Sequence, residues 1–359
     1  MLVSSTSMTR INLSPSRSTR GSAVSLLSRH NEDTPLKIAI TGAAGLVGRK
    51  LVERLARDGS LNGRAITDML LIDVIEPSAP AGVTFAVETQ AVDISAPGAY
   101  DRLAALKPDV IFHLAAIVSG EAETDFDKGY RINLDGTRGL YEAVRQAGFT
   151  PRLVFTSSIA VFGAPFPDAI GDEFLNAPLT SYGAQKAMGE LMLADYTRKG
   201  MLDGIGIRLP TIVVRPGKPN KAASGFFSGI IREPLMGHRA VCPVSRDVMH
   251  WMASPRSADN FLIHAAGLDG DKVGPRRNLT MPGIAVTVGE MVESLERVAG
   301  ADPVKLIDWQ PDPFIVKIVD GWPRRFDASR AAALGFISET DMDQIIRVFI
   351  DDELATHNL

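Results

Sequence analysis

The stretch Ile38–Leu51 reads IAITGAAGLVGRKL and joins an apolar run to an amphipathic one through three regularly spaced glycines. The apolar half is typical of a fully buried β-strand, and the half that follows has the period of a helix. Gly42 stands where the strand must turn tightly into the helix, which favours a residue that tolerates a positive φ. The stretch therefore predicts a strand, a tight glycine turn and a helix.

The spacing of these glycines suits a bound pyrophosphate. Gly45 has no Cβ, so the backbone can approach a phosphate closely, and Gly48 lets the helix pack against the strand. The N-terminus of the helix supplies free N–H groups and a favourable dipole. We therefore predict a dinucleotide site on this turn, with contacts from Gly42, Ala44, Gly45, Leu46 and Val47.

Acidic residues close the next two predicted strands. Asp73 ends the run LLID, where a carboxylate can accept hydrogen bonds from both hydroxyls of an adenosine ribose and repel a 2′-phosphate. NAD is therefore expected rather than NADP, the alternative being an Asp that only ends a strand. Asp93 and its neighbour Ile94 follow the third strand and are expected near the adenine, and a structural role for Asp93 is equally open.

Strand-like and helix-like segments alternate over well over a hundred residues after Leu36. This alternation predicts an α/β fold with a Rossmann-type, doubly wound parallel sheet covered on both faces. After Arg215 the sequence becomes rich in Gly, Pro and Lys. We expect an NAD-binding domain over residues 36–214, with 254–270 returning to it, and a smaller α/β substrate lobe over 215–253 and 271–359.

The composition of the 359 residues is that of an ordinary globular protein, with 45% hydrophobic and 22% charged residues and a net charge of −4. This balance gives no bulk attraction to nucleic acid or anionic membranes. The single cysteine and the lack of a clustered His/Asp motif suggest no metal site. We expect a cytoplasmic protein. Residues 1–35, with four arginines and no acid before Glu32, are expected to be a disordered tail, a transit peptide or upstream sequence.

A proton-transfer pair stands in SYGAQK, where Tyr182 and Lys186 are four residues apart and so share one face of a helix. A phenol is a poor base at neutral pH, and a nearby ammonium favours the phenolate. The preceding strand ends in TSS, so Thr156, Ser157 and Ser158 are all chemically suited to be the third member.

The segments TGAAGLVG, HLAA, RINLDGT, VFTSSIAVFG and SYGAQK occur in an order that resembles the extended short-chain dehydrogenase/reductase family, of the NAD-dependent epimerase/dehydratase type. The resemblance implies that Tyr182 is the base, Ser158 donates a hydrogen bond to the substrate oxygen, and Lys186 also holds the nicotinamide ribose. Ser157 is then expected only to satisfy backbone groups, and His113 to be structural or to line the cofactor cleft. It further implies that Asn133 braces a helix bend, and that the cofactor also meets Leu114, Ala115, Ala116, Asn133, Pro210 and Thr211.

Within that family, three longer segments resemble a subgroup that oxidises the C2 hydroxyl of a four-carbon sugar acid, D-erythronate, with NAD. These segments are HLAAIVSGEAETDFDKGYRINLDGTR, TSYGAQKAMGELMLADY and RLPTIVVRPGKPNKAASGFFSGIIREPL. Ile159 and Ala160 stand where dehydratases of the family carry an acidic pair, so dehydration is not expected. A small sugar acid needs cations or several donors for its carboxylate. Ser158 and Tyr182 are expected to contact the substrate. The further candidates, each about equally suited to a solvated loop, are Ser119, Glu121, Arg215, Lys218, Asn220 and Lys221.

Two other functions remain open. A nucleoside-diphosphate-sugar epimerase would use Tyr182 and a tightly bound NAD, and would need cations such as Arg324 or Arg325 for the diphosphate. A non-catalytic dinucleotide sensor would have no use for a complete Ser158, Tyr182 and Lys186 set. The family resemblance also suggests a homodimer.

Overall fold

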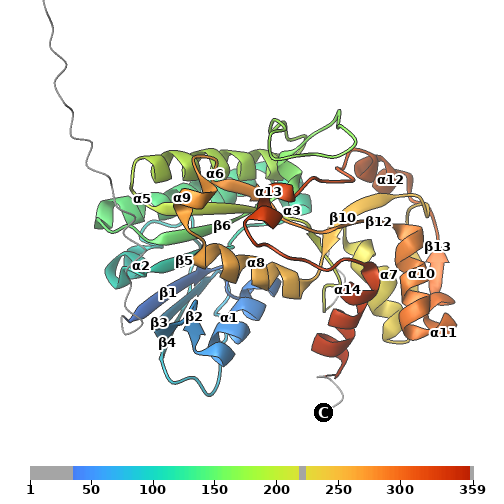
Figure 1. Cartoon of the computed structure of the whole chain (residues 1–359), viewed down its shortest axis with the longest axis horizontal. Helices are drawn as coiled ribbons and strands as arrows, with labels where there is room; N and C mark the ends of the chain where they lie inside the picture. The colour runs from blue at the N-terminus through green and yellow to red at the C-terminus, as the bar shows by residue number, and fades with distance from the viewer. Residues whose placement is uncertain (1–34, 218–223, 356–359) are drawn as a thin grey trace, which may run out of the picture. The chain divides into compact units, whose positions relative to one another are not determined.

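The computed structural model describes residues 35–217 and 224–355, so the predictions for residues 1–34 lie outside it (Figure 1). Its largest sheet has the strand order β11-β7-β6-β5-β1-β3-β2, and β4 also pairs with β3. All neighbours in it are parallel except β2, which is antiparallel to β3. The predicted parallel sheet is confirmed. Its strands are β1 Leu36–Thr41, β2 Ser60–Leu61, β3 Arg64–Asp73, β4 Ala86–Ala91, β5 Val110–His113, β6 Arg152–Ser158, β7 Asp203–Leu209 and β11 Asn278–Thr280.

The strand order reverses beside β1, which pairs with β3 on one side and with β5 on the other. In open α/β sheets, ligands bind beyond the carboxyl ends of the strands at such a switch point. The glycine turn after β1 and Ser158 at the end of β6 are therefore at the edge of the sheet where a ligand is expected.

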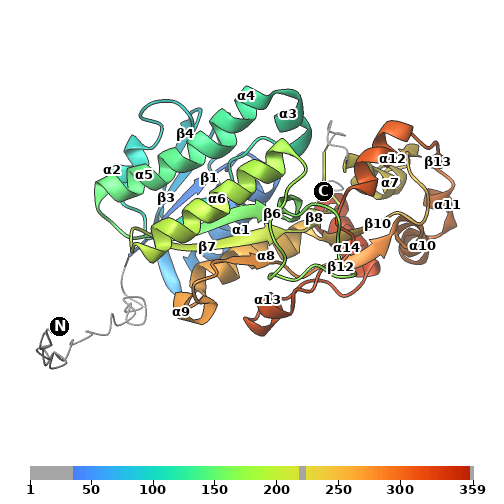
Figure 2. The ribbon, with the colours of Figure 1, turned by 90° about the horizontal axis from the view of Figure 1, so that it is seen from above.

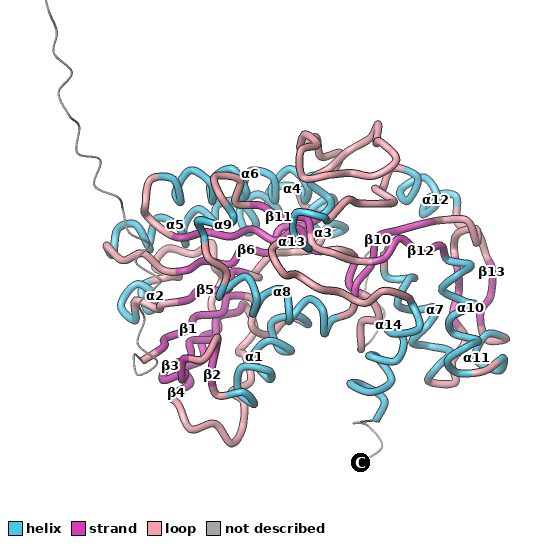
Figure 3. The backbone as a smooth tube through the Cα atoms, viewed as in Figure 1, coloured by secondary structure: helices cyan, strands magenta, loops and turns pink. Residues whose placement is uncertain are grey.

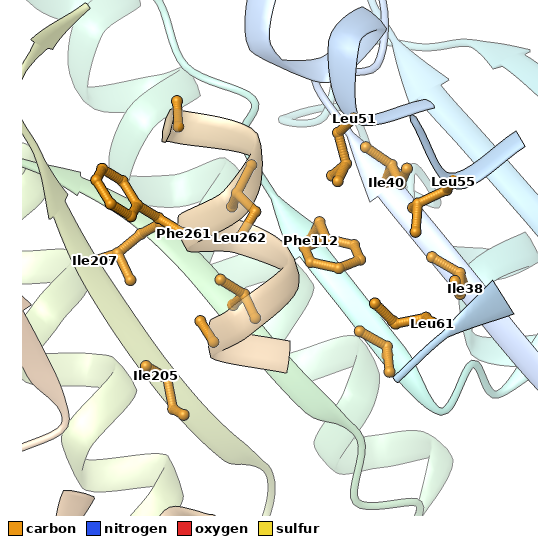
Figure 4. Packing of buried hydrophobic residues seen from close by; sticks show 14 of the residues in the cluster. Ile38, Ile40, Leu51, Leu55, Leu61, Phe112, Ile205, Ile207, Phe261 and Leu262 are labelled. Atoms are coloured by element: carbon orange, nitrogen blue, oxygen red, sulfur yellow. The ribbon is translucent and has the colours of Figure 1, made fainter. Parts of the chain in front are cut away.

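Helices cover both faces of this sheet, because alternate residues of each buried strand point to opposite sides. Ile38 and Ile40 pack with α1 and α8, whereas Ala39 belongs to the cluster under α2, α5 and α6. Figure 4 shows Leu51 and Leu55 of α1 and Phe261 and Leu262 of α8 on the same face. Each fully buried Leu or Ile side chain stabilises the folded state by about 1.5–3 kcal/mol relative to the same side chain exposed to water. The helices are α1 Leu46–Asp58, α2 Asp101–Leu106, α5 Thr137–Ala147, α6 Ser181–Arg198 and α8 Pro255–Gly267.

A second core forms where the chain leaves the main sheet at β8 (Figure 3). It brings a three-stranded sheet of order β12-β10-β8 and the pair β13-β9 together with α7, α10 and α14. These elements are β8 Thr211–Ile212, β9 Ala240–Cys242, β10 Met249–Ala253, β12 Ile284–Thr287, β13 Ile307–Trp309, α7 Gly225–Leu235, α10 Val288–Ala299 and α14 Met342–Phe349. Figure 2 shows α7 and α10 beyond the end of the large sheet.

Shorter elements lie between and after these helices and strands. A π-helical segment, η1, links α4 to α5, and η2 follows β6 directly. These elements are α3 Ser119–Thr124, α4 Phe126–Gly129, η1 Tyr130–Gly136, η2 Ile159–Val161, α9 Gly270–Val273, α11 Ala301–Val304, α12 Pro313–Asp320, α13 Ser329–Ala333 and η3 Ile350–Leu354.

The division into two lobes stays a prediction, but one part of the predicted smaller lobe lies elsewhere. β11 pairs with β7 at the edge of the main sheet, and Ala331 and Phe336 belong to the core under α1 and α8. The physical reason is that β7 carries the buried Ile205 and Ile207. The backbone groups on the open edge of this strand need another strand as their hydrogen-bonding partner. Among the described residues, no helix combines the length and the apolar character that crossing a bilayer requires.

Candidate active site

The turn after β1 has the geometry that its glycines predict. Gly42 has φ +79°, and a Cβ on it would lie 2.6 Å from the backbone nitrogen of Ala115 in the loop after β5. A Cβ on Gly48, inside α1, would lie 2.1 Å from the carbonyl oxygen of Gly42. Both positions exclude a side chain, because the turn, the helix and the neighbouring loop approach each other so closely.

The N-terminus of α1 fits the phosphates of a dinucleotide. Gly45 is its N-cap residue, with extended backbone (φ −69°, ψ 168°). In the described structure no side chain caps this end, and the first turn holds no acid. The backbone donors that begin with Leu46 and Val47, together with the helix dipole, are therefore suited to an anion.

Asp73 lies beside this turn, at the end of β3. Its Oδ2 accepts the N–H of Ala44 at 2.9 Å, and its Oδ1 accepts the N–H of Val74 at 2.7 Å. The N–H of Ala44 is thus engaged by Asp73, so Ala44 orients that carboxylate. The carboxylate therefore lies next to the glycine turn and the N-terminus of α1, where a partner of the ribose is expected.

Asp93 already has partners on both oxygens. Oδ1 accepts the N–H and the hydroxyl of Ser95, at 2.9 and 2.6 Å, and Oδ2 accepts Nη1 of Arg131 at 2.7 Å. The Ser95 hydroxyl is the largest of the influences that lower the pKa of Asp93 to about 2. Ile94 is buried, and Gly136 leaves no room for a Cβ against it. The contact of Asp93 with adenine stays a prediction.

Asn133 lies in η1 and braces the loop after β5. Its Oδ1 accepts the N–H of Ile117 at 2.8 Å, and its Nδ2 donates to Ile117 O at 3.2 Å and to Gln185 Oε1 at 2.8 Å. Leu114, Ala115 and Ala116 precede this anchor and are half-buried. Asn133 itself is buried and acts behind the loop, which agrees with the bracing role and leaves no amide donor for a cofactor.

His113 is fully buried, with Nδ1 2.7 Å from the Thr41 hydroxyl and Nε2 2.9 Å from the Thr137 hydroxyl. Burial and, secondarily, the charge of Lys186 lower its pKa to about 3. Of its two expected roles, the geometry favours the structural one.

The structure brings Ser158, Tyr182 and Lys186 together. Ser158 ends β6, Tyr182 lies in the first turn of α6, and Lys186 follows one turn later. Burial raises the pKa of Tyr182, while the charge of Arg215 and a hydrogen bond with Ser158 oppose that rise. Lys186 Nζ lies 5.7 Å from the centre of the Tyr182 ring and donates to Thr156 O at 2.7 Å. Burial lowers the pKa of Lys186 to about 7, against the charge of Glu190.

Sequence reasoning missed a buried polar network beneath these residues. The Glu190 carboxylate accepts Nε and Nη2 of Arg208, at 2.8 and 2.7 Å, and the Asn176 amide at 2.9 Å. Ser157 Oγ also donates to Glu190, at 2.6 Å, so the expectation that Ser157 only satisfies backbone groups is wrong. The spacing of Glu190, four residues after Lys186, was the available signal.

Arg215 follows the short strand β8 and is half-buried. Burial lowers the pKa of Arg215, and the Tyr182 phenol opposes that fall, while the charge of Arg215 in turn lowers the pKa of Tyr182. Its Nε donates to Ile212 O at 2.9 Å. Lys218, Asn220 and Lys221 lie outside the described residues.

The groups that shift the pKa of Tyr182 do not include the remaining candidates for contact with the substrate. Ser119 begins α3 and is half-buried, and the Glu121 carboxylate is paired with Lys128 at 2.6 Å. Arg324 and Arg325 are exposed.

Pro210 lies between β7 and β8, and Thr211, the first residue of β8, has a partner that the sequence did not reveal. His250 on β10 lies with Nε2 2.7 Å from Thr211 Oγ1 and with Nδ1 3.1 Å from Pro323 O. A carbonyl only accepts, so Nδ1 carries the proton and Nε2 accepts from the Thr211 hydroxyl. Burial lowers the pKa of His250 to about 4, which favours this neutral form.

Comparison with known proteins agrees with this geometry. Residues 38–252 match the model of the "NAD dependent epimerase/dehydratase family". A D-erythronate dehydrogenase from Cupriavidus necator is 45% identical over 88% of this chain and 98% of its own length. One from Haemophilus influenzae is 41% identical over 89% of this chain and 100% of its own. A solved structure described as a nucleoside-diphosphate-sugar epimerase from Agrobacterium tumefaciens is 60% identical, with a TM-score of 0.89, over 91% of this chain and 97% of that one.

Proposed function

The chain belongs to the NAD-dependent epimerase/dehydratase family as an NAD-dependent dehydrogenase, and we propose that it oxidises the C2 hydroxyl of D-erythronate to the 2-oxo acid. The two curated relatives support this substrate, and one observation at the site supports it independently. The Arg215 cation lies close enough to the Tyr182 phenol to lower its pKa. In a 2-hydroxy acid, the carboxylate is bonded directly to the carbon that is oxidised. A cation beside the base is therefore where that carboxylate needs its partner.

In the proposed mechanism, Tyr182 removes the proton of the C2 hydroxyl. NAD, when bound, accepts the hydride from C2. Ser158 Oγ donates a hydrogen bond to the same substrate oxygen as it becomes a carbonyl, while Arg215 holds the carboxylate. The Lys186 ammonium favours the phenolate, and Glu190, one turn further along α6, favours that ammonium.

The dinucleotide itself is held by other residues. The N-terminus of α1 is suited to its phosphates, and the Asp73 carboxylate to the hydroxyls of the adenosine ribose. The residues at the substrate end thus act on the sugar acid, and those at the turn after β1 anchor the cofactor.

An epimerase acting on a nucleoside-diphosphate sugar is the second candidate, because the solved structure at 60% identity carries that description. Such a substrate places its anionic diphosphate several bonds away from the carbinol that reacts. A cation that acts on the pKa of the base is then not needed, whereas Arg324 and Arg325 are exposed and available for the diphosphate. The position of Arg215 favours the sugar acid.

The test offers the purified protein and NAD a panel of four- to six-carbon aldonates and UDP-sugars, and follows NADH by absorbance. We expect NADH from D-erythronate in preference to the other acids. Conversion of a UDP-sugar without net NADH, with no turnover of any aldonate, would establish the epimerase instead. A cytoplasmic location and a homodimer stay predictions.

A further inference from the structure

One helix, α7, holds the backbone of Arg215 from both sides. The Arg215 N–H donates to Ser228 Oγ at 3.0 Å, and Arg232 Nη1 donates to the Arg215 carbonyl at 2.7 Å. Ser228 and Arg232 are four residues apart, so they share one face of the helix. Both are at least 96% buried. The two peptide groups of a single residue are thereby fixed by neighbouring side chains of one rigid element.

Burial of the Arg232 side chain costs free energy of folding. Taking a guanidinium out of water is unfavourable unless it is paired and its donors are hydrogen-bonded. Arg232 meets this condition through its neighbour Glu233, whose Oε1 accepts Nε at 2.9 Å and Nη2 at 2.6 Å. The third donor group is the one that reaches Arg215. Folding alone would be served by an apolar side chain of similar volume at this position, so a role in placing Arg215 explains the arginine better.

The side chain of Arg215 is held as well, since its Nε donates to Ile212 O. With its N–H, its carbonyl and its Nε all engaged, the residue has little conformational freedom left to lose when an anion binds. Preorganisation of this kind raises affinity by lowering the entropic cost of binding.

We propose that Ser228 and Arg232 are positioning residues, which hold the Arg215 cation against the carboxylate of the substrate and so set the preference for a charged acid over a neutral analogue. This inference rests on the proposed function, because it takes Arg215 as the partner of that carboxylate. Neither residue touches the reacting atoms, so neither should contribute to the chemical step itself.

The experiment compares D-erythronate with D-erythronamide, which has the same C2 hydroxyl but no carboxylate charge. The quantity measured is kcat/KM for the acid divided by kcat/KM for the amide. We expect Arg232→Met and Ser228→Ala each to lower this ratio about 10-fold, the scale of one buried hydrogen bond. The change should come from KM for the acid, with kcat at saturation and the Kd of NAD unchanged.

Ser294→Ala is the matched control, because Ser294 is also buried and also accepts from an arginine, Nη2 of Arg297 at 2.6 Å, but on α10. It should leave the ratio at the wild-type value. In an Arg215→Met background, Arg232→Met should change the ratio less than about twofold, since the positioned cation is already absent.

The outcomes separate this inference from the proposed function. A wild-type protein that oxidises D-erythronate, with an unaltered ratio in Arg232→Met and Ser228→Ala, would overturn the positioning role alone. A wild-type protein with no activity on the acid would overturn the proposed function and this inference with it. Should Arg232→Met fail to fold, Ser228→Ala and Arg232→Lys decide, and a wild-type ratio in both contradicts the role.

Discussion

Tyr182 is surrounded by groups that act on its pKa in opposite directions. Burial raises the pKa, and Arg215 and Ser158 lower it. Lys186, whose own pKa burial brings to about 7, lies against the same ring. The two groups that favour the phenolate, Arg215 and Ser158, are also the proposed partners of the substrate, so the proposed function couples binding and proton transfer at one residue.

Tyr182→Phe should therefore abolish turnover while leaving the Kd of NAD nearly unchanged, because the phosphates and the adenosine ribose are held at the turn after β1. Ser158→Ala should be milder, with a loss of about 10²–10³ in kcat, the contribution of one donor to a developing oxyanion. Calorimetric titration with NAD and steady-state rates check both variants. Appreciable turnover by Tyr182→Phe would remove that residue from the role of base.

We predict that Asp73 decides between the two nicotinamide cofactors. Its carboxylate is fixed by the N–H groups of Ala44 and Val74 beside the glycine turn. Asp73→Ser should weaken NAD about 10–100-fold, as expected for lost hydrogen bonds to a charged group, and should improve the relative use of NADP. Kinetics with both cofactors provide the measurement. Equal use of NAD and NADP by the wild-type protein would show that Asp73 does not discriminate.

At the scale of elements, the contact between α1 and α8 contains an unusual carboxyl group. Asp259 on α8 is 7% exposed, and its Oδ1 has no hydrogen-bond partner among the described residues. Burial raises its pKa to about 8, against the charges of Lys50 and Arg54 on α1 and together with those of Glu53 and Asp352. The folded protein therefore keeps a proton that the unfolded chain releases near pH 4.

This group makes folding take up a proton between about pH 4 and pH 8, so its contribution to stability falls as the pH rises through that window, by at most about 1.4 kcal/mol per unit. Asp259→Asn should remove this slope, so that the unfolding temperature of the variant exceeds that of the wild type by more at pH 8 than at pH 5. Thermal unfolding monitored by circular dichroism over this range is the measurement.

Asp343→Asn is a control of opposite sign, because pairing with Arg297 lowers the pKa of Asp343. It should cost less than about 1 kcal/mol, since the pair is largely exposed. An equal gain for both variants at pH 8 would point to net charge rather than to the buried carboxyl of Asp259.

The elements that could be predicted are those whose signals are local in the sequence. The apolar run before Gly42, the helix that Gly59 ends and the four-residue step from Tyr182 to Lys186 all depend on neighbouring residues, and the structure has each of them. What could not be predicted depends on distant partners. β11 is three residues long and takes its place only because β7 offers an edge. Two hydrogen bonds, from Arg232 to Arg215 and from Thr211 to His250, join segments that are distant in the sequence. No local pattern in either segment indicates the position of the other.

For the molecule as a whole, the site lies where its two cores meet. The chain leaves the main sheet after β7, enters the second core through β8, and reaches Arg215 three residues later. The base comes from a helix on the main sheet, whereas the cation is held by α7 of the second core. In the proposed function, cofactor chemistry and substrate recognition are thus supported by separate hydrophobic cores. A substitution in α7 can therefore alter the substrate preference while NAD binding stays intact.

In the proposed reaction, the hydride at C2 of a short sugar acid passes to NAD and does not return. Incubation with NAD and D-erythronate deuterated at C2, followed by mass spectrometry of the cofactor, tests it most directly. We expect deuterated NADH and the 2-oxo acid in equal amounts, and neither from Tyr182→Phe. Absence of label in the cofactor, together with epimerisation of a UDP-sugar that keeps its own deuterium, would contradict the proposed reaction.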